Sequence, residues 1–98
     1  MIKQAPVKGS NQIKVSFVLP SDRIAGKVSV VGDFNGWDPA SHPLRKRANG
    51  TRSVSVSLPA GGRYAFRYVS ADGTWHDDDA VSEFEPNGLG GANAVFAT

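Results

Sequence analysis

The stretch Val28-Ser29-Val30-Val31-Gly32-Asp33-Phe34-Asn35-Gly36-Trp37-Asp38-Pro39 decides the fold class, because a β-branched run ends within it at a tight turn. The stiff side chains of residues 28–31 suit a pleated, half-buried strand. Gly32 and the pairs Asn35-Gly36 and Asp38-Pro39 supply the turn chemistry that stops such a strand. We therefore expect a strand that runs into a tight turn.

Two aromatic residues, Phe34 and Trp37, lie three positions apart across this turn, so we expect their side chains to point in different directions. If Phe34 folds back onto the core, Trp37 is left near the surface with a flat face available to a ligand. The alternative is that Trp37 only caps the edge of the core, since tryptophan is usually highly but not fully buried. The turn by itself leaves both interpretations open.

Alternating apolar and polar side chains recur along the rest of the chain. The alternation is clearest in segments 12–19, 51–58 and 63–70, and a last short strand is expected at 92–97. Turns rich in glycine, proline and asparagine separate these segments, and no segment has the apolar spacing of a helix. The pattern predicts an all-β protein, an antiparallel β-sandwich of about seven strands.

The 98 residues have room for one domain, which can bury about 60 to 65% of its unfolded surface. Residues 1–11 predict a flexible N-terminal segment, and residues 12–98 predict a single β-sandwich domain. The N-terminal residues resemble neither a signal peptide nor a membrane span, and the chain has no cysteine. We therefore expect a soluble, cytoplasmic protein.

The net charge of +2 is too small to indicate a polyanionic partner, but the charges are unevenly distributed. A basic group and a later acidic group are both interpreted as solvated loop charge. The basic group is Arg45, Lys46, Arg47 and Arg52, and the acidic group is 77–79, Glu83 and Glu85. If the chain binds a ligand through aromatic side chains, a single strand of nucleic acid is the main alternative to a sugar, because positive charge and aromatic stacking both suit it. We do not expect nucleic acid or a membrane as a partner.

No arrangement of residues in the sequence indicates catalysis. Glycoside hydrolysis needs two carboxylates roughly 5 to 9.5 Å apart, whereas the acidic residues here lie mostly in one loop. The run 77–79 lacks the alternate spacing of a calcium loop, and Gly88-Leu89-Gly90-Gly91 lacks the helix and lysine of a phosphate cradle. We expect no enzyme activity, no catalytic residue, no metal and no cofactor.

Binding is better supported than catalysis. Trp37 and Trp75 each lie beside a turn, Arg67 points away from the core face of its strand, and Asn93 opens the last strand. Aromatic platforms flanked by an amide and a guanidinium suit ring-shaped ligands that carry many hydroxyl groups.

Several motifs occur in the order seen in one known family. They are Gly32-Asp33-Phe34-Asn35-Gly36-Trp37, Phe66-Arg67-Tyr68, Asp72-Gly73-Thr74-Trp75 and Leu89-Gly90 with Asn93. Over about residues 12–96 the chain resembles the family-48 carbohydrate-binding modules, including the isoamylase N-terminal domain. These are early-set immunoglobulin-like domains that precede the catalytic domain of glycogen branching and debranching enzymes. The glycogen-binding domain of the AMP-activated protein kinase beta subunit is similar.

The resemblance implies a non-catalytic module that binds α-glucan, namely glycogen, starch or maltooligosaccharide. Trp37 and Trp75 would stack on glucose rings, and Leu89 would insert against one. Arg67 would take the place of a sugar-contacting lysine, which changes the hydrogen-bond geometry, and Asn93 would bond to hydroxyl groups. The alternative is a scaffold that binds little sugar and associates with a separate glycoside hydrolase, branching enzyme or kinase.

Overall fold

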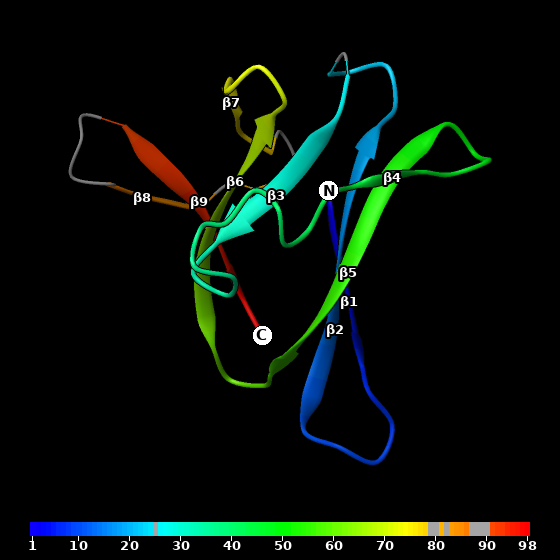
Figure 1. The fold of residues 1–98 in the computed structure, drawn as a ribbon. Helices are drawn as coiled ribbons and strands as arrows, with labels where there is room; N and C mark the ends of the chain where they lie inside the picture. Colours follow the sequence, from blue (N-terminus) through cyan, green and yellow to red (C-terminus); the bar gives the residue numbers. More distant parts are fainter. Residues whose placement is uncertain (25, 79–80, 82, 87–90) are drawn as a thin grey trace.

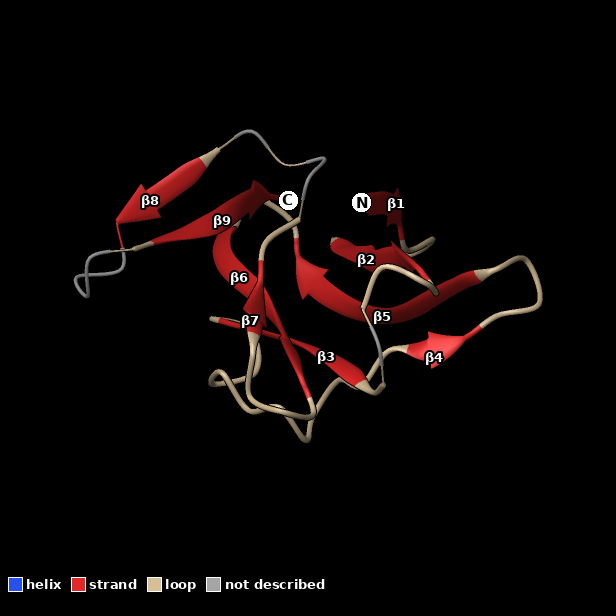
Figure 2. Ribbon diagram, turned by 90° about the horizontal axis from the view of Figure 1, so that it is seen from above, coloured by secondary structure: helices blue, strands red, loops and turns tan. Residues whose placement is uncertain are grey.

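The computed structural model describes residues 1–24, 26–78, 81, 83–86 and 91–98. Within them nine strands and no helix form two antiparallel sheets, which pack as a sandwich (Figures 1 and 2). The first sheet contains β1 (Ile2–Pro6), β2 (Gln12–Pro20), β5 (Thr51–Pro59) and β4 (Arg45–Lys46), in that order. The second contains β3 (Val28–Gly32), β6 (Arg63–Ser70), β9 (Ala92–Ala97) and β8 (Phe84–Pro86), and β7 (Trp75–His76) pairs with β6. The predicted all-β, immunoglobulin-like sandwich is confirmed, although the described residues form nine strands and not the expected seven or so.

The core between the sheets is centred on Phe17 of β2. Its ring centroid lies 5.4 Å from that of Phe34, 5.3 Å from that of Phe66 and 5.7 Å from that of Phe96. Phe34 therefore folds back onto the core, which is one of the two arrangements that the sequence leaves open, and Leu44 is buried in the loop that follows the turn. Burial of these large side chains is the main favourable contribution to the fold.

Three short strands lie where the sequence predicts no regular structure. Arg45–Lys46 falls in the expected basic loop and forms β4 against β5, from Arg45↔Ser53 to Lys46↔Arg52. Ile2–Pro6 falls in the segment expected to be flexible, yet β1 pairs with β2 from Ile2↔Phe17 to Pro6↔Ile13. Phe84–Pro86 falls in the expected acidic loop and forms β8 against β9. Most side chains of β1 are exposed, so the strand is held by backbone pairing and leaves no apolar alternation to detect.

Two charged residues predicted to lie in solvated loops are buried instead. Arg52 is in β5 opposite Leu19, and it donates a hydrogen bond to the carbonyl of Gly26. Asp78 is 1% exposed and accepts hydrogen bonds from the Tyr68 hydroxyl at 2.8 Å and from the N-terminal ammonium at 2.6 Å. The prediction is wrong for Arg52 and Asp78 because a charge becomes tolerable inside a protein when distant segments supply its partners.

Strand β6 carries the outer surface on which the candidate site lies. One edge of β6 pairs with β3, while β9 and then β7 follow one another along the other edge. Phe66 and Tyr68 point into the core, so Ala65, Arg67 and Val69 point outward. The outer face of the second sheet gathers side chains from all five of its strands.

The described part of the chain contains no helix of the length and apolar character that crossing a bilayer requires. Among the same residues no group of three His, Asp or Glu side chains is placed to hold a metal ion.

Candidate functional site

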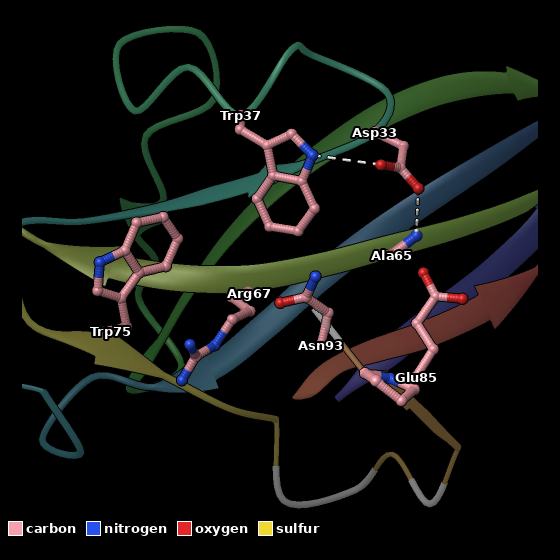
Figure 3. A pocket seen from close by; sticks show the side chains of 8 residues that line it. Asp33, Trp37, Ala65, Arg67, Trp75, Glu85 and Asn93 are labelled. Carbon is pink, nitrogen blue, oxygen red and sulfur yellow. Dashed lines mark hydrogen bonds between the residues drawn. The ribbon is translucent and has the colours of Figure 1, made fainter. Parts of the chain in front are cut away.

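A cleft of about 590 Å³ opens on the outer face of the second sheet (Figure 3). The residues that line it are Asp33, Trp37, Ala65, Arg67, Trp75, Glu85, Pro86 and Asn93. Trp37, Arg67, Trp75 and Asn93, which the sequence singles out as candidate binding residues, all line this one cleft. Leu89, the fifth candidate, lies outside the described residues.

Strand register explains how residues far apart in the sequence meet at the cleft. Trp75 of β7 pairs with Val69, which shares the outer face of β6 with Arg67. On β9, Ala94 faces the core opposite Phe66, so the preceding Asn93 points outward. Glu85 of β8 pairs with Asn93 and joins it on that face.

The turn after β3 is held by the side chain of Asn35. Its Oδ1 accepts hydrogen bonds from the backbone N–H groups of Gly32 at 3.0 Å and Trp37 at 3.1 Å. Its Nδ2 donates to the carbonyl of Val30 at 3.1 Å and lies 3.0 Å from His42 Nδ1. With all of its hydrogen-bonding capacity engaged, Asn35 makes this turn a rigid support for Trp37.

Trp37 has a backbone conformation that is unusual for its residue type. Its φ is 60°, in the left-handed region that costs a residue with a side chain roughly 1–2 kcal/mol. The indole Nε1 donates to Asp33 Oδ1 at 3.2 Å, and Asp33 Oδ2 accepts from the backbone N–H of Ala65 at 2.9 Å (Figure 3). A bulky residue held in this region at the wall of a cleft supports a functional hypothesis.

Trp75 of β7 lies beside Val69, near the C-terminal end of β6, and is 47% exposed. The guanidinium carbon of Arg67 lies 5.6 Å from the centroid of the ring, a cation–π contact. Arg67 Nε also donates to Asp77 Oδ1 at 3.1 Å. These two contacts fix Arg67 against the indole, and the guanidinium still has further N–H donors.

The hairpin between β6 and β7 is stabilised by Asp72. Its Oδ1 accepts hydrogen bonds from the Ser70 hydroxyl and from the backbone N–H of Thr74, at 3.0 Å for the latter. These hydrogen bonds, that from Ser70 first, lower the pKa of Asp72 to about 2. The turn that presents Trp75 is therefore held by an ionised carboxylate.

Asp33 and Glu85 line the cleft but are not among the candidates that the sequence suggests. Asp33 lies inside the turn motif, and its position there is the one signal that could have identified it. Glu85 is hidden in an acidic stretch because β8 has only three residues, too few for a period to appear. Arg63 NH1 donates to Glu85 Oε2 at 2.8 Å, and its NH2 donates to Glu83 Oε1 at 3.3 Å. These bonds raise the pKa of Arg63.

The charged side chains of the cleft are thus engaged with the protein itself. Arg67 bonds to Asp77, Glu85 bonds to Arg63, and both oxygens of Asp33 accept hydrogen bonds. Opposite charges placed side by side largely cancel at a distance. The cleft therefore offers two aromatic faces and hydrogen-bonding groups, and it contains one carboxylate whose two hydrogen-bond donors are uncharged, that of Asp33.

Comparison with known proteins identifies the family of this chain. The sequence model of the family carbohydrate-binding module 48 (isoamylase N-terminal domain) matches residues 9–82. The chain belongs to this family. The predicted resemblance is confirmed, and the outer-face cleft lies on a carbohydrate-binding module.

The curated relatives of this family-48 module are much longer proteins. The 1,4-alpha-glucan branching enzyme GlgB 2 of Xanthomonas campestris pv. campestris (strain 8004) is 46% identical over 50 residues, which are 50% of this chain and 7% of that enzyme. The 1,4-alpha-glucan branching enzyme GlgB of Ralstonia nicotianae is 49% identical over 55 residues, with the same shares of 50% and 7%. The module thus spans about 7% of the length of these relatives.

Proposed function

We propose that this module binds α-glucan chains without cleaving them, and that glucose rings stack on Trp37 and Trp75. The observation that carries the proposal is that two indoles from distant segments line one cleft together with Arg67 and Asn93. Membership of a carbohydrate-binding family supports a sugar ligand, and relatives named α-glucan branching enzymes support the α-glucan class.

The chemistry of the cleft fits a neutral ring that carries hydroxyl groups. The apolar face of a glucose ring covers an indole, while its hydroxyls meet the Asn93 amide, which both donates and accepts. Arg67 adds donors that are already oriented by Asp77 and by the Trp75 ring. Because Arg67 is held before a ligand arrives, its use in binding sacrifices little side-chain freedom.

The affinity expected from these contacts is modest. One stacked ring face buries on the order of 80 Å² of apolar surface, which contributes roughly 2 kcal/mol at about 25 cal/mol per Å². Two such stacks must also offset several kcal/mol of lost translational and rotational freedom. We expect a dissociation constant on the order of 10 μM to 1 mM.

The test is titration with maltoheptaose by isothermal calorimetry and amide chemical shifts. Trp75→Ala should weaken binding at least about tenfold and leave the melting temperature nearly unchanged, because the ring is largely exposed. Phe84→Ala is the matched control, since Phe84 is 45% exposed and does not line the cleft. A Trp75→Ala protein that binds as the wild type does, or equal losses in both variants, would contradict the proposal.

Salt dependence separates glucan from nucleic acid as the ligand. Binding to a phosphate backbone weakens steeply as salt rises, whereas stacking on a neutral sugar barely responds. Burial of Arg52 removes one of the four cations from the basic group that nucleic acid would contact. Salt-sensitive binding of single-stranded RNA with no response to maltoheptaose would favour nucleic acid.

The two carboxylates at the cleft make the absence of hydrolysis a testable part of the proposal. Asp33 and Glu85 are each held by protein donors, an arrangement that supports the turn and the sheet edge. We expect the purified module to release no reducing sugar from glycogen. Release that disappears in Asp33→Asn or Glu85→Gln would show that the module is an enzyme.

A further inference from the structure

A second groove of about 420 Å³ lies on the same outer face as the cleft. Its floor includes Ser29 of β3 and Val69 of β6. Pro39, Ala40 and Pro43 line one side, and Ala71 lies in the turn on the other. The lining is mainly apolar, and none of the described residues that form it carries a carboxylate.

The second groove continues the cleft along β6. Arg67 lines the cleft, and Val69 is the next outward residue of that strand, about 7 Å further along. Val69 also pairs with Trp75, so this platform of the cleft stands directly beside the groove. Trp37 lines the cleft, and the loop that follows it contains Pro39 and Ala40, which line the groove.

Hydrogen bonds hold the sides of the groove in place. The loop after Trp37 returns along β3, where the Val30 N–H donates to the His42 carbonyl at 3.1 Å and the Leu44 N–H donates to the Val28 carbonyl at 2.9 Å. On the other side, the Ala71 N–H donates to the Lys27 carbonyl at 2.9 Å. The groove is therefore preformed and needs no rearrangement to accept a ligand.

We propose that this groove is a second subsite for the same α-glucan chain, so that a chain stacked on Trp37 and Trp75 continues over Val69. The inference rests on the proposed function. A neutral apolar floor suits the face of a further sugar ring, and Lys27 and Ser29, which also line the groove, can bond to hydroxyl groups. Because the subsite extends the cleft, it contributes to binding only when the glucan chain is longer than the cleft alone can hold.

The test compares maltotriose with maltoheptaose on the ¹⁵N-labelled protein. Both sugars should shift the amide signals of Ala65 and Arg67 at the cleft. Only maltoheptaose should also shift those of Ala40 and Ala71, with the same midpoint as the cleft signals. Signals at the groove that respond with a different midpoint, or that respond in a Trp37→Gly variant without cleft binding, would show a separate site and overturn the inference.

Ala40→Leu blocks the groove with a branched side chain that offers no flat face, and Ala40 is exposed, so the fold should tolerate it. We expect maltoheptaose affinity to fall about fivefold to tenfold and maltotriose affinity to stay within about twofold. Ala60→Leu is the matched control, because Ala60 is an exposed alanine that lines neither hollow.

Val69→Ala gives a second measurement if Ala40→Leu fails to fold, and it should show the same selective loss. If maltoheptaose binds both variants as it binds the wild type, the subsite is wrong and the proposed function stands. If neither sugar shifts any signal in the wild type, the proposed function fails as well.

Discussion

Replacing Trp37 by glycine should give a more stable protein than replacing it by alanine, although both changes remove the same indole. Trp37 has a φ of 60°, a backbone conformation that costs alanine roughly 1–2 kcal/mol of conformational energy and costs glycine almost nothing. The greater conformational freedom of glycine in the unfolded chain reduces this advantage of Trp37→Gly by about 0.4–1 kcal/mol. The net advantage of Trp37→Gly is therefore about 1 kcal/mol, or about 4–8 °C in melting temperature for a domain of this size.

The assay is urea unfolding of both variants followed by circular dichroism, alongside maltoheptaose titration. Ala60→Gly is the control, because Ala60 lies in a turn without positive φ, and glycine there should destabilise by about 0.4–1 kcal/mol. Both Trp37 variants should lose at least about tenfold in affinity, which separates binding from stability. If Trp37→Ala is as stable as Trp37→Gly, the backbone strain inferred at this position is refuted.

Three further predictions concern the supports of the two platforms. Gly32→Ala should lower the free energy of unfolding by about 1–3 kcal/mol in urea titrations, because a Cβ there would lie 2.5 Å from the Ala65 carbonyl oxygen. An unchanged unfolding midpoint would mean that the turn can move away from β6. Asp33→Asn replaces one of two acceptor oxygens by a donor, so the free energy of unfolding should fall by about 1 kcal/mol. Calorimetry should show severalfold weaker binding of maltoheptaose, and unchanged binding would show that Asp33 does not orient Trp37. The pKa of Asp72 is lowered to about 2, so its stabilising contribution is fully present above the ordinary value of about 3.9 and is lost as pH falls toward 2. Urea unfolding between pH 5 and 2, compared with Asp72→Asn, checks this, and parallel pH profiles of the two proteins would contradict it.

Local patterns in the sequence predict the strands that form the middle of each sheet. In segments 12–19, 51–58 and 63–70 one face packs against the core and the other turns away from it, and that difference leaves alternation in the chain. The turn chemistry around Asn35 and Gly36 is equally local, because the bonds of Asn35 reach no further than His42. The expectation that Phe34 and Trp37 point in different directions follows from the same turn.

The candidate residues Trp37, Arg67, Trp75 and Asn93 could be chosen from motifs, yet no motif states that they share a cleft. Register decides this, because Trp75 meets Val69 and Asn93 lies one residue from the pair Ala94↔Phe66. Pairing depends on backbone contacts between segments far apart in sequence, which side-chain periodicity records only indirectly.

The sequence by itself determined the all-β class, the central strands and the turn that carries Trp37, since each depends on neighbours within a few residues. Only the tertiary structure decided that Ile2–Pro6 forms an edge strand, that Arg52 and Asp78 are buried, and that Asp33 and Glu85 border the site. The physical reason is that backbone pairing, charge burial and cleft formation depend on partners brought together by folding, whose identity no single segment contains.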